Sequence, residues 1–443
     1  MPAMYTYDRK EHEKRMAWFQ EARFGLFIHW GLYSISGKGE WERSDGRLPA
    51  QPYEGRIADF TASRYEPREW ARLARRAGMR YAVLTTKHHD GFCLFDSALT
   101  DFKATESPAG RDLVAEYVTA FREEGLKVGL YYSLLDWHHP DYPHSTDMLH
   151  PMRGNPDYPD EGRDFNRYLD YMHGQIRELM TNYGRIDMLF LDYSYGDMKG
   201  EKWKAAELVD MVRTLQPGIV INNRLETGGA TFGSLLTRNP LPWHGDYVTP
   251  EQIIPPKGIR NEDGELVPWE SCVTMNGHWG YCTLDRNWKS SRTLVRKLVE
   301  CVSKGGNMIL NVGPDAYGAF PQESIDILED FARWMDKNGE SIHGCGPYEA
   351  PKPEYGRFTK NGDRLFFHAF EKALGAMPIE GVPRDRVLSA RALATGGELP
   401  IVDNFSYGAF PDTIFVDTGS TAQLPDETDY VIELRLKEEG RSR

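Results

Sequence analysis

Short apolar runs alternate with amphipathic segments over the first three quarters of the chain. Each run is bounded by turn-forming residues, a pattern typical of strands that are buried on both faces. The clearest runs lie at residues 23–31, 81–86, 126–133, 185–196, 218–223, 268–275 and 307–314. Between them, apolar residues recur at helical spacing, which predicts helices at about 67–79, 112–124, 164–183, 203–215, 291–303 and 322–338.

This alternation of strands and helices predicts an α/β fold with a parallel sheet. Roughly eight strands separated by helices fit a (β/α)8-type, TIM-like barrel better than an open doubly wound sheet. No GxGxxG motif follows the first strand, which argues against a dinucleotide-binding domain.

The pattern changes near Pro347. The runs at 364–370, 386–393, 412–418 and 429–437 alternate or are rich in β-branched residues, and no helical segments lie between them. We therefore expect two domains, a catalytic barrel over residues 1–346 and a small C-terminal antiparallel β-sandwich over residues 347–443.

The totals exclude several classes of function. The net charge of −13 argues against nucleic acid or an anionic membrane as partner, because both attract clustered Lys and Arg. The five cysteines (Cys93, Cys272, Cys282, Cys301 and Cys345) show no CxxC spacing, so we expect neither a disulfide framework nor a structural zinc site. The N-terminal residues lack the apolar core of a signal peptide, and no segment reaches the roughly 20 apolar residues of a membrane span. We expect a cytoplasmic protein, with secretion after removal of a signal peptide left open.

Polar side chains recur where the predicted strands end, which is where a barrel places its active site. They are His29, His88, His89, Tyr131, Tyr132, Asp192, Arg224, Glu251 and, less clearly, Glu270. Asp192 ends an apolar run, and packing alone gives no reason for a carboxylate there. Each residue also has an ordinary explanation: Asp192 could cap a loop or helix, and a single His is more often a hydrogen-bonded core or loop residue.

Two chemistries fit this set of residues. In glycoside hydrolysis, one carboxylate attacks the anomeric carbon and another protonates the leaving oxygen, and a retaining enzyme holds the two about 5–5.5 Å apart. Neutral His, Tyr and Arg would then hold sugar hydroxyls. In metal-assisted hydrolysis, His29, His88, His89, His138 or His139 and Asp192 would be ligands, although no HxH or HExxH motif is present. A non-catalytic sugar-binding protein is a third alternative.

The chain also carries longer motifs. FGLFIHWG at 24–31 and TKHHDGF at 86–92 are the most specific, and GEW, LFLD, NNR, GDYVTPEQ and HWGY follow along the chain. Together these motifs resemble those of the α-L-fucosidases of glycoside hydrolase family 29, in the same order, and the resemblance covers about residues 15–345.

The resemblance implies a retaining exo-α-L-fucosidase that removes terminal fucose from fucosylated oligosaccharides or glycoconjugates through a covalent fucosyl-enzyme intermediate, with no cofactor and no metal. By the family's motif, Asp192 is the nucleophile. The implied fucose-binding residues are His29, Glu40, Trp41, His88, His89, Tyr131, Arg224 and Trp279. The linkage, the aglycone and the oligomeric state, a homo-oligomer included, stay open.

The resemblance does not fix the acid/base residue, because it lies on a variable part of the family's chain. Our prediction is Glu270, which follows Asp192 in sequence and ends an aromatic-led segment. Glu251 and Glu40 are the alternatives, and Glu270 could instead be structural. The chain departs from the family at Phe190, where a Trp often stands two residues before the nucleophile.

Overall fold

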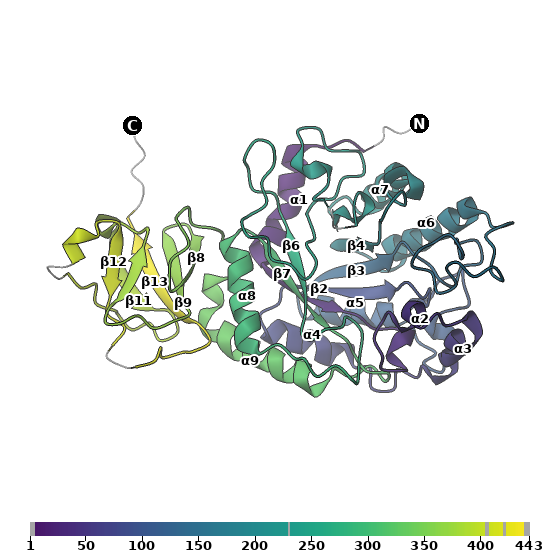
Figure 1. Ribbon diagram of the computed structural model, residues 1–443, viewed down its shortest axis with the longest axis horizontal. Helices are drawn as coiled ribbons and strands as arrows, with labels where there is room; N and C mark the ends of the chain where they lie inside the picture. Colours follow the sequence, from purple (N-terminus) through teal and green to yellow (C-terminus); the bar gives the residue numbers. More distant parts are fainter. Residues whose placement is uncertain (1–4, 229–230, 404–406, 420–421, 438–443) are drawn as a thin grey trace.

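The computed structural model describes residues 5–228, 231–403, 407–419 and 422–437. Its larger part is built on a seven-stranded parallel sheet with the strand order β5-β4-β3-β2-β1-β7-β6 (Figure 1). These strands are β1 (Phe24–Ile28), β2 (Tyr81–Lys87), β3 (Lys127–Ser133), β4 (Met188–Asp192), β5 (Val220–Ile221), β6 (Glu270–Thr274) and β7 (Asn307–Val312). Every residue of β1, β2, β6 and β7 is buried, which explains why these strands show no alternation of polar and apolar residues.

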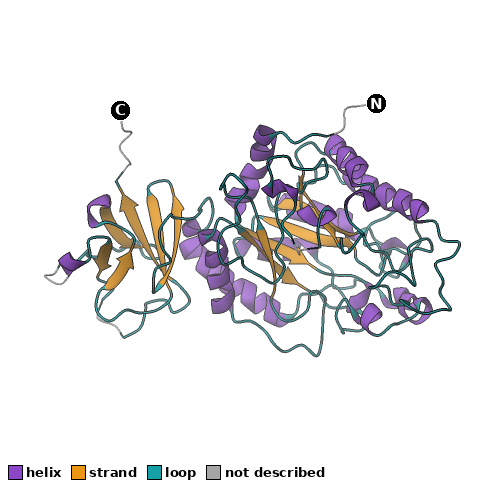
Figure 2. Cartoon of the chain, turned by 45° about the horizontal axis from the view of Figure 1, so that its top comes forward, coloured by secondary structure: helices purple, strands orange, loops and turns teal. Residues whose placement is uncertain are grey.

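Helices surround this sheet (Figure 2). The long ones are α1 (Arg9–Ala22), α4 (Pro67–Arg76), α5 (Leu113–Glu123), α6 (Phe165–Asn182), α7 (Ala205–Leu215), α8 (Ser291–Ser303) and α9 (Gln322–Asn338), and the short α2 (Glu42–Asp45) and α3 (Ala50–Glu54) lie in one loop. Local signals start several of them: Asp112, Asp164 and Ser290 accept backbone N–H bonds as N-caps. In the described part of the chain, no helix is long and apolar enough to cross a membrane.

The barrel is only partly closed. Strands β5 and β6 are the edges of the sheet, and residues 246–251, which we call the seam, run between them. The seam forms no continuous ladder with its neighbours. Isolated parallel bridges instead pair Asn222 with Tyr247, Val248 with Trp269 and Glu251 with Cys272. Among the described residues there is thus no regular eighth strand, which corrects the expectation of a regular (β/α)8 barrel.

Asp246 anchors the start of the seam. Its carboxylate is buried and accepts hydrogen bonds from Arg15 and Arg213, each at 2.9–3.0 Å, and from the backbone N–H of Ile221. A buried carboxylate of this kind is stable only when it is paired. Hydrogen bonds and ion pairs of Asp246 therefore hold the seam in place. The seam lacks the run of apolar residues by which a buried strand is recognised in a sequence.

The C-terminal part is antiparallel, as expected. Four strands form one sheet in the order β11-β13-β9-β8, and two more form the pair β10-β12. Their bounds are β8 (Gly356–Asn361), β9 (Arg364–Ala369), β10 (Met377–Glu380), β11 (Val387–Ala392), β12 (Thr413–Val416) and β13 (Tyr430–Leu436). One apolar core contains side chains from both sheets, and β8 lies against α8 of the larger part (Figure 1). The division at residues 346 and 347 stays a prediction.

Candidate active site

A pocket opens at the C-terminal ends of the parallel strands. It is lined by Phe27, His29, Glu40, Trp41, His88, His89, Tyr131, Phe190, Asp192, Tyr193, Glu251, Cys272 and Trp279. Most of the predicted site residues belong to this lining. Arg224, Glu270 and Tyr132 do not, and neither do His138 and His139, the alternative metal ligands. The fold therefore brings together residues from segments far apart in the sequence.

Arg224 lies directly behind the lining and joins two of its three carboxylates, Asp192 and Glu251. Its Nη1 donates to Asp192 Oδ1 at 3.2 Å, and its Nη2 donates to Glu251 Oε2 at 3.0 Å. The guanidinium is itself fixed, because Nε donates to Thr249 Oγ1 at 2.8 Å and Nη2 to the Thr249 carbonyl at 3.1 Å. One buried cation thus holds Asp192 and Glu251 on the two arms of a single planar fork.

The environment of Asp192 tunes its charge. Burial raises the pKa of this carboxyl to about 6, Arg224 opposes the rise, and the negative charge of Glu251 adds to it. Tyr131 donates its hydroxyl to Asp192 Oδ2 at 2.8 Å, and the Tyr193 backbone N–H donates to Oδ1 at 3.0 Å. Asp192 is therefore ionised at neutral pH and held in one orientation.

Glu251 differs from Asp192 in its exposure. Its side chain is 45% exposed, whereas that of Asp192 is 14% exposed. Asp192 therefore lies inside the pocket and Glu251 at its mouth.

The three pocket histidines are neutral at physiological pH. Burial lowers the pKa of His29 to about 3 and lowers those of His88 and His89 well below their usual value. Neutral imidazoles hydrogen-bond sugar hydroxyls without adding charge to the pocket.

Hydrogen bonds fix the tautomer of His29. Its Nδ1 lies 2.6 Å from Asn311 Oδ1, and the Asn311 amide nitrogen donates to the Trp279 carbonyl at 2.7 Å. An amide oxygen only accepts, so His29 Nδ1 carries the proton and Nε2 is left as an acceptor.

The same logic applies to His89, whose Nδ1 lies 2.6 Å from Ser133 Oγ. That hydroxyl already donates to the Leu135 carbonyl at 3.0 Å, so His89 Nδ1 is the donor. His88 differs, because its Nδ1 is buried and has no hydrogen-bond partner among the described residues. A buried polar atom without a partner is unfavourable, so a ligand hydroxyl that hydrogen-bonds to it would remove this penalty.

Aromatic rings form the floor and one wall. Phe190 stacks on Tyr131 with ring centroids 5.8 Å apart, and the Arg224 guanidinium lies 6.0 Å from the centre of the Phe190 ring. Trp279 packs against His29 at 5.1 Å. Glu40 is buried beside this wall and accepts a backbone hydrogen bond from Gly280 at 2.8 Å. Phe190, two residues before Asp192 on β4, thus forms the floor of the pocket.

The structure places Glu270 outside this pocket. Glu270 is the first residue of β6, at the end of the strand remote from the pocket, and it is fully buried. Tyr81 donates its hydroxyl to Glu270, whose other oxygen has no partner among the described residues. Burial raises the pKa of Glu270 to about 8.

Glu270 is therefore outside the lining of this pocket, and its predicted role as proton donor stays an untested prediction. Glu270 and Cys272 point to the same side of the strand, but Cys272 reaches the pocket and Glu270 lies about 7 Å deeper along β6.

Sequence reasoning left three lining residues without a role: Phe27, Tyr193 and Cys272. The signal for Phe27 was available, since it lies two residues before His29 on an extended segment and therefore faces the same way. Cys272 gave no such signal, because the candidate two residues before it, Glu270, lies outside the pocket. Tyr193 gave no such signal, because its orientation depends on a turn at the end of β4.

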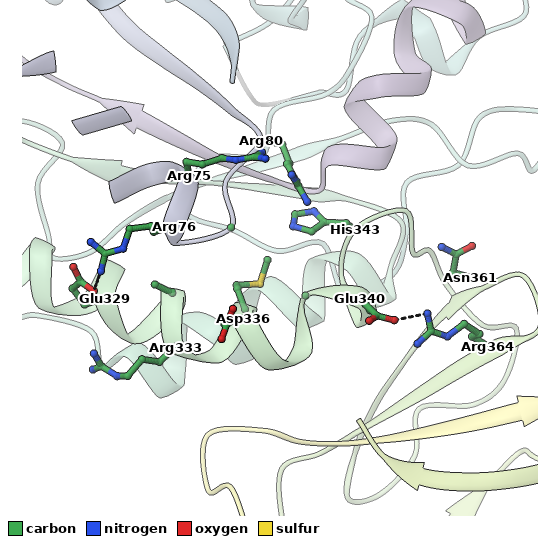
Figure 3. Close-up of a pocket in the computed structure, with 14 residues that line it drawn as sticks. Arg75, Arg76, Arg80, Glu329, Arg333, Asp336, Glu340, His343, Asn361 and Arg364 are labelled. Carbon is green, nitrogen blue, oxygen red and sulfur yellow. Dashed lines mark hydrogen bonds and ion pairs between the residues drawn. The ribbon is translucent and has the colours of Figure 1, made fainter. Parts of the chain in front are cut away.

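Other parts of the chain offer less for catalysis. A larger groove lies between α4, α9 and the C-terminal domain and is lined by charged side chains (Figure 3). It lies beside Arg80, at the opposite end of β2 from His88, and Arg76, Arg333 and Arg364 are already paired with carboxylates there.

In the part of the chain that the structure describes, no group of three or more His, Cys, Asp or Glu is arranged to hold a metal ion. The five cysteines are free thiols.

Comparison with known proteins places these features in a family. A family model described as α-L-fucosidase matches residues 2–340. The solved structure of α-L-fucosidase isoenzyme 1 from Paenibacillus thiaminolyticus is 54% identical, with a TM-score of 0.93 over 97% of this chain and 100% of that one.

Two more distant relatives agree. A family 29 α-L-fucosidase from Bacteroides thetaiotaomicron, solved as a trapped covalent intermediate with 2-fluoro-fucosyl fluoride, is 27% identical, with a TM-score of 0.82 over 99% and 98% of the two chains. Human tissue α-L-fucosidase is 29% identical over 375 residues, which are 78% of this chain and 73% of the human one.

Proposed function

The chain belongs to the α-L-fucosidases of glycoside hydrolase family 29, and on that premise we propose that Asp192 is its nucleophile and Glu251 its acid/base. The enzyme hydrolyses α-L-fucosides with retention of configuration, in line with the covalent intermediate of the Bacteroides relative. The substrates are fucosylated oligosaccharides or glycoconjugates that carry a terminal fucose.

One observation carries the assignment of the two carboxylates. Arg224 binds Asp192 and Glu251 at the same time, at 3.2 and 3.0 Å. Two carboxylates on one guanidinium are separated by only a few ångströms, which is compatible with the spacing of about 5–5.5 Å that a retaining mechanism uses.

In the first step, an oxygen of Asp192 attacks the anomeric carbon of fucose and the glycosidic C–O bond breaks. Glu251, in its protonated form, donates its proton to the departing oxygen, so that the aglycone leaves as an alcohol. Arg224 compensates the charge of Asp192 before attack, and Tyr131 keeps the attacking carboxylate oriented.

In the second step, the ionised Glu251 takes a proton from water as that water attacks the fucosyl–Asp192 ester. The ester C–O bond breaks and Asp192 leaves as a carboxylate, which restores the enzyme. The exposure of Glu251 at the pocket mouth supports this role, because water reaches it there.

The remaining residues hold the sugar. The acceptor Nε2 atoms of His29 and His89, the unpartnered Nδ1 of His88 and the carboxylate of Glu40 suit the hydroxyl groups of fucose. Trp279 supplies apolar surface, which suits the methyl group and the C–H faces of the sugar.

The test uses glycine variants and azide, a small anion that enters the space left by a carboxylate. In Asp192→Gly, azide takes the place of the nucleophile in a single inverting displacement, so the product is β-L-fucosyl azide. In Glu251→Gly, azide attacks the fucosyl-enzyme intermediate in place of water, so the product is α-L-fucosyl azide. An aryl fucoside with an acidic leaving group is the substrate, because its first step needs no proton donor.

Glu270→Gly serves as the matched control and should give no azide product. If Glu251→Gly keeps wild-type turnover of a fucosyl disaccharide, or if Glu270→Gly is the variant that yields α-L-fucosyl azide, Glu251 is not the acid/base. Loss of activity with a chelator would instead favour the metal-dependent alternative.

We also propose a cytoplasmic location, which the five free cysteines favour because disulfides rarely persist in reducing compartments. Fractionation of the source cells with an antibody to the chain tests this proposal.

A further inference from the structure

The residue directly after Asp192 has an unusual backbone. Tyr193 has φ of +75°, in the left-handed region that bulky side chains rarely adopt. Such a conformation is energetically unfavourable for a residue with a Cβ atom, and it persists only where the surroundings impose it.

The direction of β4 explains what this conformation achieves. Successive side chains on a strand point to opposite faces, so an extended residue after Asp192 would point away from the pocket. The left-handed turn instead makes both Asp192 and Tyr193 line the same pocket, and it aims the Tyr193 N–H at Asp192 Oδ1. The strained conformation therefore presents the Tyr193 ring to the pocket.

That ring lies between the inner pocket and the surface. It packs edge-on against His89, with centroids 4.7 Å apart and planes at 84°, and against Trp41 at 5.5 Å and 65°. Both Tyr193 and Trp41 are only partly buried, and the Tyr193 hydroxyl has no hydrogen-bond partner in the described part of the chain. We call these two rings the aromatic rim.

We propose that the aromatic rim is the binding platform for the sugar to which fucose is attached, with Tyr193 as the residue that determines specificity. The inference rests on the proposed function, because it places fucose among the histidines and Asp192. The next unit of the substrate then leaves the pocket past the half-exposed rings. Partly exposed aromatic rings in a pocket mouth suit a ligand with an apolar face, and a pyranose presents such a face through its C–H groups.

The test compares a substrate that has an adjacent sugar with one that has none. Fucosyl fluoride carries no aglycone sugar, whereas α1-2, α1-3, α1-4 and α1-6 fucosyl disaccharides do. The readout is the ratio of kcat/KM for the best disaccharide to kcat/KM for fucosyl fluoride. Tyr193→Gly removes the ring and suits the left-handed backbone, whereas Tyr193→Ala removes the ring and keeps the strain.

We expect this ratio to fall about tenfold in both variants, near the upper end of what one aromatic contact contributes. Tyr193→Phe should restore the wild-type ratio, because the ring and not the hydroxyl makes the contact. Tyr317→Ala, which removes a half-exposed ring outside the pocket, is the control and should leave the ratio unchanged.

A ratio within about twofold of wild type in Tyr193→Gly overturns the proposal. An equal loss on both substrates also overturns it, since Tyr193 would then act on Asp192 alone. Wild-type protein that hydrolyses neither substrate contradicts the proposed function instead, so the two failures are distinct. If Tyr193→Ala does not fold, Tyr193→Gly alone decides.

Discussion

Replacing Arg224 tests how the site keeps a buried carboxylate reactive. Burial raises the pKa of Asp192 to about 6, and Arg224 is the strongest influence that lowers it. Arg224→Gln removes that cation but keeps a polar side chain of similar length. Since an opposite charge within hydrogen-bonding distance lowers a carboxyl pKa by about 1–3 units, its loss should raise the pKa of Asp192 by a comparable amount.

The sign of the effect on activity follows from the role of Asp192. The nucleophile must be ionised, so kcat/KM falls as the pH drops below the pKa of Asp192 in the free enzyme. In wild type this acidic limb should lie near pH 6. In Arg224→Gln it should move about 1–3 units higher, and activity at neutral pH should fall accordingly.

The assay is kcat/KM for an aryl α-L-fucoside with an acidic leaving group, measured between about pH 4 and 9, because this substrate isolates the nucleophile from the proton donor. Arg224→Lys keeps the charge and loses the two-armed contact, so its limb should move less than that of Arg224→Gln. Arg167→Gln, which loses a two-armed ion pair with Asp141 outside the pocket, is the control. An acidic limb that stays in place or moves to lower pH in Arg224→Gln would refute the reasoning.

Three further predictions use the same contacts. Tyr131→Phe removes a hydrogen bond that lowers the pKa of Asp192. The acidic limb of kcat/KM should therefore move to higher pH, by less than in Arg224→Gln. The Glu270→Gln variant should become more stable relative to wild type as pH rises from 5 to 8. The pKa of Glu270 is about 8 in the folded protein, above its value in the unfolded chain, so the stability that this carboxyl contributes at low pH is lost as pH rises. Glutamine does not titrate and loses nothing over this range. The Tm of the variant relative to wild type should therefore increase between those pH values, and a difference independent of pH would contradict the burial argument. Phe190→Ala should lower the free energy of unfolding by about 3–5 kcal/mol in denaturant titrations, because it empties the floor beneath Tyr131; a loss below about 1 kcal/mol would mean that the floor collapses to fill the space.

Much of the fold could be predicted from periodicity. Strands buried on both faces are largely apolar, so β1, β2 and β7 are visible as short apolar runs, and the cap at Asp112 marks the start of α5. The seam could not be predicted in this way. Its position depends on an ion-paired Asp246 and on isolated bridges, and neither leaves a repeating pattern in the sequence.

The candidate site shows the same division. His29, His88 and Asp192 follow directly from strand ends, because the carboxyl ends of parallel strands meet at one edge. The sequence could not show that Glu270 lies outside the pocket lining, because the motif around it does not reveal that β6 begins there and reaches the pocket only at later residues. Glu251 was the weaker candidate because it lies on the seam and not on a recognisable strand.

The irregular seam has a consequence for how such an enzyme can change. In a continuous ladder, one inserted residue turns every following side chain to the opposite face, so β4 fixes the position of Asp192 rigidly. The seam forms isolated bridges with β5 and β6 and no continuous ladder, so we expect an insertion or deletion between Tyr247 and Glu251 to displace Glu251 more than it displaces the strands of the sheet. Selection for new leaving groups is therefore best directed at the length of this segment. The nucleophile can stay in place while the reach of the proton donor is adjusted one residue at a time.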